Sequence, residues 1–152
     1  MTIIRKMGDS DIDSIMDIWF QSTVDAHPFI DLHYWEKSYE VVKREYLPQS
    51  KTLVFEEGGV IKGFISLIEE AFIGALFILP RYQHQGIGKK LLEAVFRHQS
   101  ELTLAVYGEN KNAVLFYKKM GFQIIDRQLN VDSGKAEYIM KKKGLNVVNP
   151  KS

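Results

Sequence analysis

LFILPRYQHQGIGKKLL, residues 76–92, joins an apolar run to a helical pattern through a proline and two glycines. The apolar run ends at Pro80, and from Gly86 onward apolar residues recur at helical spacing. A helix start carries unpaired backbone N–H groups and the positive end of the helix dipole, so it attracts anions. Gly86 and Gly88 place no side chain between those groups and an anion. The stretch therefore predicts an anion site, although a flexible turn from strand to helix would use the same glycines.

Two common phosphate-binding loops do not fit these glycines. The dinucleotide fingerprint needs a third glycine at the position where this chain has Leu91. A Walker A loop needs a glycine five positions before the Gly-Lys pair, and Gln83 stands there. The anion is therefore expected to be held by a different kind of loop.

Apolar periodicity divides the rest of the chain into short strands and helices. Apolar runs predict strands at residues 2–6, 52–57, 60–68, 72–80, 102–107, 122–129 and 136–142. Apolar stripes at helical spacing predict helices that begin near Ser10, cover 33–46, begin at Gly86 and cover 113–120. This order favours a mostly antiparallel sheet with helices on its faces. The strand–helix–strand segment across 72–107 adds one right-handed parallel connection.

Bulk composition limits the class of protein. The chain has 152 residues, 45% of them hydrophobic and 26% charged, which is ordinary for one globular domain. A net charge of +1 gives no reason to expect nucleic acid or an anionic membrane as a partner. Without cysteine there is no disulfide, thiolate nucleophile or cysteine-bound zinc, and the histidines form no metal motif. No signal-peptide pattern and no apolar run of the ~20 residues that span a membrane are visible. We expect a cytoplasmic domain over residues 1–143 and a flexible tail over 144–152.

A second motif lies downstream of residues 83–89, here called the glycine loop. NKNAVLFYKKMGF (110–122) predicts a helix that ends at a glycine, and one helix and one strand separate it from the first motif. Together the two motifs resemble the acetyl-CoA-binding motifs of the GNAT superfamily of N-acetyltransferases. The resemblance implies an α/β (α+β) fold over residues 2–142, with a mixed, mostly antiparallel central sheet that is splayed in the middle and flanked by about four helices. A small bacterial subgroup, which includes proposed protein-lysine acetyltransferases, has similar segments to WFQS (19–22), HPFI (27–30) and AVYGEN (105–110).

The resemblance assigns the acetyl-CoA site residue by residue. The CoA pyrophosphate would rest on the glycine loop, and the residues implied are Gln83, His84, Gln85, Gly86, Ile87, Gly88 and Lys89. The pantetheine arm would pair with the main chain of the preceding strand at Leu76, Phe77 and Ile78. The acetyl carbonyl would meet a strand amide that acts as an oxyanion donor. Asn110 would contact the cofactor, although a residue at that position also serves as a helix cap.

Tyr117 stands where the resemblance places a tyrosine that protonates the departing thiolate. A phenol with an ordinary pKa of about 10 can give its proton to a thiolate whose thiol has a pKa of about 8.5 when the two are held together. Tyr117 also lies on the apolar stripe of its helix, so a structural role in the core is the alternative. We favour the general-acid role because both motifs are present.

Several groups could accept the proton that the amine loses. Relatives place a glutamate at one of two positions, which hold Phe72 and Ala105 in this chain. The remaining candidates are Glu69, Glu70, Glu109 and His27. Of these, His27 lies in a loop and has an ordinary pKa of about 6.5, which suits a base or an acceptor contact. Glu70 lies at a strand turn and is the second candidate base, and a chain of water molecules without a single base is the alternative.

These assignments describe an N-acetyltransferase. The acceptor would be a protein lysine, a protein N-terminus or a small amine, and it would attack acetyl-CoA directly in a ternary complex. The lack of cysteine agrees with direct attack, because no thioester intermediate can form on the protein. The alternative is a catalytically weak, acetyl-CoA-binding regulatory module, which the two missing glutamates suggest. We expect acetyl-CoA as co-substrate, no metal, no nucleic-acid or membrane partner, and a monomer or homodimer.

Overall fold

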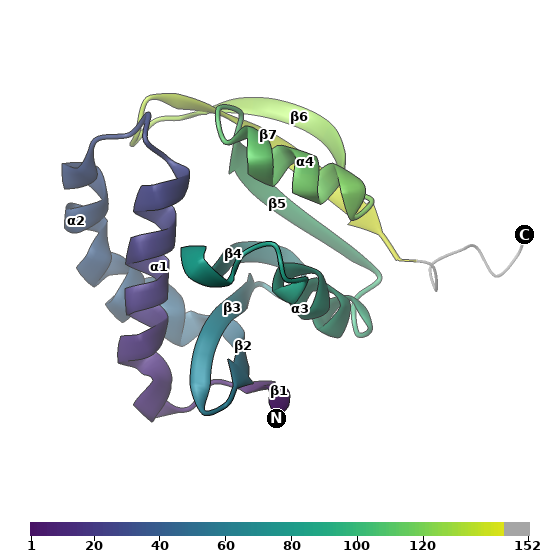
Figure 1. The fold of residues 1–152 in the computed structure, drawn as a ribbon. Helices are drawn as coiled ribbons and strands as arrows, with labels where there is room; N and C mark the ends of the chain where they lie inside the picture. The colour runs from purple at the N-terminus through teal and green to yellow at the C-terminus, as the bar shows by residue number, and fades with distance from the viewer. Residues whose placement is uncertain (145–152) are drawn as a thin grey trace, which may run out of the picture.

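In a computed structural model, which describes residues 1–144, the chain forms one sheet of seven strands (Figure 1). The strands are β1 (Thr2–Lys6), β2 (Lys51–Glu57), β3 (Val60–Ile68), β4 (Phe72–Ile78), β5 (Glu101–Tyr107), β6 (Gln123–Asn130) and β7 (Lys135–Lys143). Their order across the sheet is β1-β2-β3-β4-β5-β7-β6. All neighbouring pairs are antiparallel except β4 and β5, which run parallel. The predicted mixed, mostly antiparallel sheet is confirmed.

The described chain has four α-helices, two on each face of the sheet (Figure 1). They are α1 (Ile12–Ala26), α2 (Leu32–Val41), α3 (Ile87–Phe96) and α4 (Lys111–Lys119). α1 and α2 bury Met16, Trp19 and Trp35 against one face. α3 and α4 bury Leu91 and Tyr117 against the other. The sheet therefore lies between two separate hydrophobic cores.

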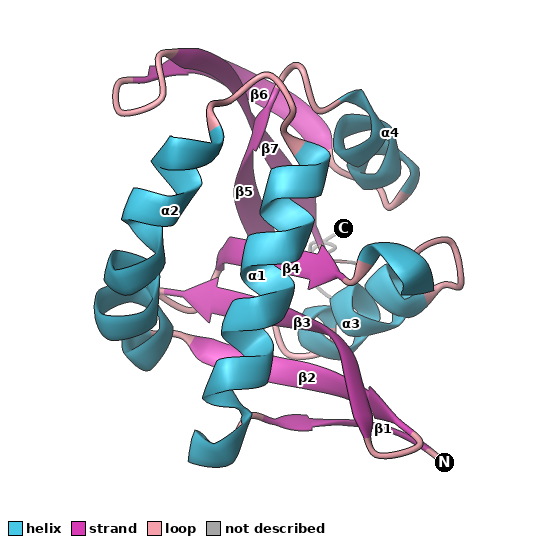
Figure 2. Cartoon of the chain, turned by 60° about the vertical axis from the view of Figure 1, so that its left-hand side comes forward, coloured by secondary structure: helices cyan, strands magenta, loops and turns pink. Residues whose placement is uncertain are grey.

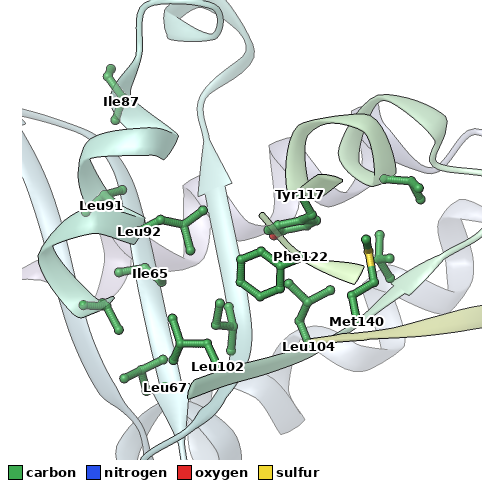
Figure 3. Close-up of a cluster of buried hydrophobic side chains, with 14 of the residues drawn as sticks. Ile65, Leu67, Ile87, Leu91, Leu92, Leu102, Leu104, Tyr117, Phe122 and Met140 are labelled. Carbon is green, nitrogen blue, oxygen red and sulfur yellow. The ribbon is translucent and has the colours of Figure 1, made fainter. Parts of the chain in front are cut away.

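The apolar stripe of α3 holds the glycine loop against the sheet. Ile87, Leu91 and Val95 follow one another at four-residue spacing, and each is at most 5% exposed. Figure 3 shows Leu91 and Leu92 beside Ile65 of β3. Burial of one leucine or isoleucine side chain contributes about 1.5–3 kcal/mol. The stripe thus fixes the position of the helix start, where the predicted anion site lies.

The sheet opens between β4 and β5. The two strands pair only near their starts, Phe72 with Thr103 and Ile73 with Leu104. Beyond these positions β4 pairs only with β3, and β5 only with β7. Figure 2 shows the two strands diverging from this point. The edge of β4 that faces β5 is therefore left without a partner strand, as expected for a splayed sheet.

Several predicted boundaries differ in the structure, and two of the differences are informative. The helix predicted over 33–46 is α2 followed by a π-helical turn, Val42–Tyr46. The strand predicted over 72–80 ends at Ile78, because Pro80 begins a 3-10 turn. Proline has no backbone N–H and a fixed φ, so it cannot continue a strand ladder.

The last described residue, Gly144, contacts the residue that precedes β5. The N–H of Gly144, the first residue of the expected tail, donates to the Ser100 carbonyl at 2.6 Å, so this glycine is attached to the domain. The rest of the expected tail, residues 145–152, lies outside the described residues.

Candidate active site

The glycine loop has a backbone shape that exposes its amides. Gly86 precedes α3 with φ 82°, in the left-handed region, and His84 has φ 66°. A left-handed conformation costs a residue with a side chain roughly 1–2 kcal/mol but costs glycine little. Within the described chain, the backbone N–H groups from His84 to Lys89 donate to no protein acceptor. The loop therefore presents free donors at the positive end of α3.

The structure assigns Gly88 a role that the sequence interpretation did not include. A Cβ atom on Gly88 would lie 3.2 Å from Cζ of Phe116 on α4, which is closer than an ordinary contact. A Cβ atom on Gly86 would meet no atom within 4 Å. Gly88 thus allows α3 to pack against α4, whereas Gly86 is required by the shape of the loop.

A cleft of about 780 Å³, here called the β4–α4 cleft, lies between the end of β4, the glycine loop and α4. The residues assigned to the cofactor that line it are Leu76, Phe77, Ile78, Gln83, His84, Gly86, Ile87, Gly88, Lys89, Asn110 and Tyr117. Gln85, which was also assigned, does not line it. The two sequence motifs therefore form walls of one cleft. Ser22 and Ala26 of α1 and Phe29 also line the cleft and were not assigned to it from the sequence. Ser22 and Phe29 lie in the segments 19–22 and 27–30 that resemble the bacterial subgroup, which was the available signal for them.

The open edge of β4 turns backbone groups toward the cleft. Leu79 donates its N–H to β3 at 2.9 Å, and backbone groups alternate in direction along a strand. Those of Ile78 and Leu76 therefore point toward the gap beside β5. The Ile78 carbonyl is already occupied, because it accepts from Ser22 Oγ at 3.2 Å and from Gln83 Nε2 at 3.1 Å. Leu76 is left to pair with an extended ligand, and the Gln83 side chain braces the loop against the strand.

Tyr117 is buried in the core and also lines the cleft. Its ring packs against Phe116 and Phe122, with centroids 5.3 and 5.5 Å away, and Figure 3 shows it beside Phe122. Burial raises the pKa of the Tyr117 phenol, and no hydrogen bond to another described residue offsets that effect. The hydroxyl is therefore protonated at neutral pH and free to donate. The residue belongs to the core and lines the cleft, and its general-acid role stays a prediction.

A second cavity of about 870 Å³, here called the α2 cavity, lies between α2 and the sheet. Gly74 and Ala75 of β4 line the α2 cavity, whereas the next residue, Leu76, lines the β4–α4 cleft. Tyr107, at the end of β5, also lines the α2 cavity. Consecutive residues of β4 therefore line the cavity and the cleft, at the point where β4 and β5 diverge.

Asn110 caps α4 and is held in one orientation. Its Oδ1 accepts from the Ala113 N–H at 3.3 Å, and its Nδ2 lies 3.4 Å from His27 Nε2. His27 Nδ1 lies 2.7 Å from the Thr23 carbonyl, which can only accept. Nδ1 therefore carries the proton, and Nε2 accepts from Asn110. The amide of Asn110 is thus oriented by a residue 83 positions away in sequence.

The two bases favoured from the sequence, His27 and Glu70, line neither the cleft nor the cavity. His27 is 7% exposed, and its ring lies between those of Trp35 and Tyr107. Glu70 is exposed in the turn between β3 and β4, where its φ is 72°. Glu109 lines the β4–α4 cleft but is exposed. The structure therefore brings Tyr117 and Asn110 together with the glycine loop, and it leaves the base role of His27 or Glu70 a prediction without geometric support.

The burial of His27 predicts a loss of stability in acid. Burial lowers the pKa of His27 from its ordinary value of 6.5, because a charged imidazolium is poorly solvated there. Below about pH 6.5 the unfolded chain then binds more protons than the folded chain, so the free energy of unfolding falls until the lowered pKa is reached. Thermal unfolding between about pH 7.5 and 5 should show this fall. His27→Gln should flatten the profile, whereas His33→Gln, which changes an exposed histidine, should not; an equal slope in all three proteins would contradict the assignment.

The candidate site comprises the β4–α4 cleft and the α2 cavity. Among residues 1–144, no helix has the length and apolar character needed to cross a membrane. No group of three or more histidine, cysteine, aspartate or glutamate side chains in the same range is placed to hold a metal ion.

The splayed sheet, the open edge of β4 and the free amides at the start of α3 define a transferase of the acetyl-CoA-dependent class. A family model described as "Acetyltransferase (GNAT) domain" matches residues 26–143. The chain belongs to the GNAT acetyltransferase family, and it is an acetyl-CoA-dependent N-acetyltransferase. The family expected from residues 76–92 and 110–122 is confirmed.

Three relatives are informative. The chain is 37% identical over 124 residues to the peptidyl-lysine N-acetyltransferase YiaC of Escherichia coli (strain K12), which covers 82% of this chain and 85% of that protein. It is 27% identical over 161 aligned positions to the spermidine N(1)-acetyltransferase of Thermoplasma acidophilum, covering 92% and 96%. The crystal structure of the PaiA N-acetyltransferase of Thermoplasma acidophilum in complex with coenzyme A has a TM-score of 0.81 and 24% identity, covering 94% of this chain and 99% of that one. The last comparison confirms the fold.

Proposed function

We propose that the protein transfers the acetyl group of acetyl-CoA to the side-chain amine of a protein lysine, by direct attack in a ternary complex. The observation that carries the proposal is that Ala75, which lines the α2 cavity, and Leu76, which lines the β4–α4 cleft, are consecutive at the splay; this position is here called the junction. A thioester lying along β4 would reach the junction between Leu76 and Ala75, and an amine in the α2 cavity would approach it from the other side. Direct attack requires such an arrangement, because the reacting atoms must be held about 3–3.5 Å apart.

The chain's own groups would bind and orient the thioester. Free amides from His84 to Lys89 hold the pyrophosphate at the positive end of α3. The main chain of Leu76 pairs with the pantetheine arm, and an N–H on the open edge of β4 stabilises the charge that develops on the thioester oxygen. Tyr117 donates its proton to the departing thiolate, which supplies the general acid that the reaction needs.

Charge and shape in the α2 cavity favour a cationic acceptor with one charge. Asp31 and Asp132, from the start of α2 and the turn between β6 and β7, are the acidic residues among the described residues that line it. Burial, together with the nearby negative charge of Asp132, raises the pKa of Tyr34 to about 12. The lining also includes Ile68 and Phe72, which suit the apolar stem of a lysine. A polyamine carries further charges along its length; beyond these two aspartates the described lining offers no carboxylate, and Lys37 adds a positive charge to it.

Initial-rate kinetics test the proposal. The release of free CoA thiol is measured with lysine-containing peptides and, separately, with polyamines. We expect a higher kcat/KM for the peptides, and intersecting rather than parallel double-reciprocal lines, because both substrates are bound before either product leaves. A preference for polyamines would overturn the acceptor, and parallel lines would overturn direct attack. Binding of acetyl-CoA without thiol release from any amine would favour the regulatory module instead.

Removal of the charge on Asp132 should weaken the binding of the acceptor peptide. We expect Asp132→Asn to raise the KM for a lysine peptide about 2- to 5-fold, with a smaller effect at high salt, because an exposed charge contributes modestly and is screened. The matched control is Asp17→Asn, which makes the same change in net charge on the exposed face of α1. An equal rise in KM in both variants would show that Asp132 has no specific role.

A further inference from the structure

Three hydroxyl side chains form a hydrogen-bonded row at the wall of the α2 cavity. Thr52 Oγ1 on β2 lies 2.6 Å from Ser66 Oγ on β3 and 2.9 Å from Ser50 Oγ. Ser50 Oγ lies 2.8 Å from the Leu47 carbonyl oxygen. Thr52 and Ser66 are each 5% exposed, and Ser66 lines the cavity. The row therefore leads from the Leu47 carbonyl to a buried hydroxyl that faces the acceptor side of the site.

The row can satisfy its three contacts in one direction only. The Leu47 carbonyl is only an acceptor, so Ser50 donates its proton there. The contact between Ser50 and Thr52 must then use the Thr52 proton, and the contact between Thr52 and Ser66 must use the Ser66 proton. Any other assignment leaves one contact without a proton. Ser66 therefore has no proton left to donate, and it presents only lone pairs to the cavity.

Ser66 lies next to the point where the reactants are proposed to meet. It is paired with Ala75 in the β3–β4 ladder, and paired residues have their side chains on the same face of the sheet. Ala75 lines the α2 cavity, and the residue after it, Leu76, lines the β4–α4 cleft. Neighbouring strands are about 4.8 Å apart, so Ser66 is one strand spacing from the junction.

We propose that Ser66 Oγ accepts a hydrogen bond from the nitrogen of the acceptor amine, and that Thr52 and Ser50 are positioning residues that keep Ser66 an acceptor. The proposal rests on the proposed function, since it takes the acceptor to be a lysine side chain. The bound ammonium donates one N–H to Ser66. After it has lost one proton to water, the neutral amine keeps that hydrogen bond and has its lone pair free to face the thioester carbon. The row also polarises Ser66, because each hydroxyl donates to the next. Ser66 thereby orients the nucleophile without accepting its proton.

Binding of two matched peptides to the CoA-loaded protein tests the contact. One peptide contains lysine, and the other contains Nε-trimethyl-lysine, which keeps the positive charge but has no N–H. We expect Ser66→Ala to raise the Kd of the lysine peptide about tenfold, the size expected for a lost hydrogen bond to a charged group, and to leave the trimethyl-lysine peptide unchanged. An unchanged Kd for the lysine peptide, or an equal loss for both peptides, would overturn the proposal.

Two further variants test the direction of the row. Thr52→Val should raise the Kd of the lysine peptide less than Ser66→Ala does. In the double variant Ser66→Ala/Thr52→Val it should cause no further rise in Kd, because Thr52 acts only through Ser66. Ser38→Ala is the control: Ser38 lines the same cavity, but its hydroxyl donates to the Tyr34 carbonyl at 2.8 Å. We expect it to leave both Kd values unchanged. Additive losses, or the same selective loss in Ser38→Ala, would contradict the directional row.

The binding measurement separates this proposal from the proposed function, because it does not require turnover. A selective loss in Ser66→Ala without thiol release from any peptide would support the hydrogen bond and refute the lysine acetyltransferase. Normal turnover of lysine peptides with no selective loss would refute the hydrogen bond alone. Thermal unfolding and the Kd for CoA confirm that each variant is folded.

Discussion

A Tyr117→Phe variant is expected to lose at least about 100-fold in kcat, while its KM for acetyl-CoA stays within about twofold. The phenol is protonated at neutral pH, since burial raises the pKa of Tyr117 further above neutrality, and the residue lines the β4–α4 cleft. The same poor solvation disfavours a free thiolate, so a proton delivered to the sulfur removes a buried negative charge. Without the hydroxyl, the thiolate would have to leave unprotonated.

The variant keeps the phenyl ring, so its packing against Phe116 and Phe122 should be retained, and thermal unfolding should change little. Rates of thiol release at varied acetyl-CoA concentration measure kcat and KM separately. Tyr82→Phe is the matched control, because Tyr82 lines the same cleft and loses the same hydroxyl. Full activity in Tyr117→Phe would contradict the general-acid role and leave Tyr117 with a structural role in the core only.

Gly86→Val is expected to raise the KM for acetyl-CoA at least about tenfold, because a β-branched residue with positive φ is a backbone outlier that the loop can relieve only by changing shape. A valine side chain would meet no protein atom near its Cβ, so the effect comes from the backbone and not from a clash. A change in φ from 82° would turn the free amides away from their common direction. The pyrophosphate would then lose donors, which weakens the ground-state complex.

The control for this effect is Gly59→Val. Gly59 has φ 79° and, like Gly86, would meet no atom within 4 Å through an added Cβ, but it lies in the turn between β2 and β3. Both variants should lose similar stability in thermal unfolding, and only Gly86→Val should change the KM for acetyl-CoA. An unchanged KM in Gly86→Val would mean that the glycine loop does not hold the pyrophosphate.

Local patterns in the sequence were sufficient for the fold class and for one half of the site. The order of strands and helices follows from apolar periodicity, because each element buries one face or one stripe against the sheet. The glycine loop and the Asn110–Tyr117 segment are short, continuous motifs, so each can be recognised without knowledge of contacts to distant parts of the chain. Their shared cleft follows once the two motifs are placed in one fold. Boundaries were less certain where helical geometry changes within a continuous pattern, as at Val42–Tyr46.

The other half of the site depends on contacts between residues that are distant in sequence. His27 became a partner of Asn110, 83 positions away, and Ser66 became an acceptor because Thr52 lies opposite it in the ladder. No sequence pattern reports which way a buried hydroxyl points, since that direction depends on the partners that the fold supplies.

The sequence by itself determined the family, the order of the elements and the position of the glycine loop at the start of α3, because each depends on the spacing of residues along one segment. Only the tertiary structure decided where the sheet opens, which cavity adjoins the cofactor cleft and which polar groups face it. Those features depend on the pairing of β4 with β5 at only two positions. The extent of that pairing depends on how β3 and β7 hold β4 and β5 from their other edges, so no single segment of the sequence determines it.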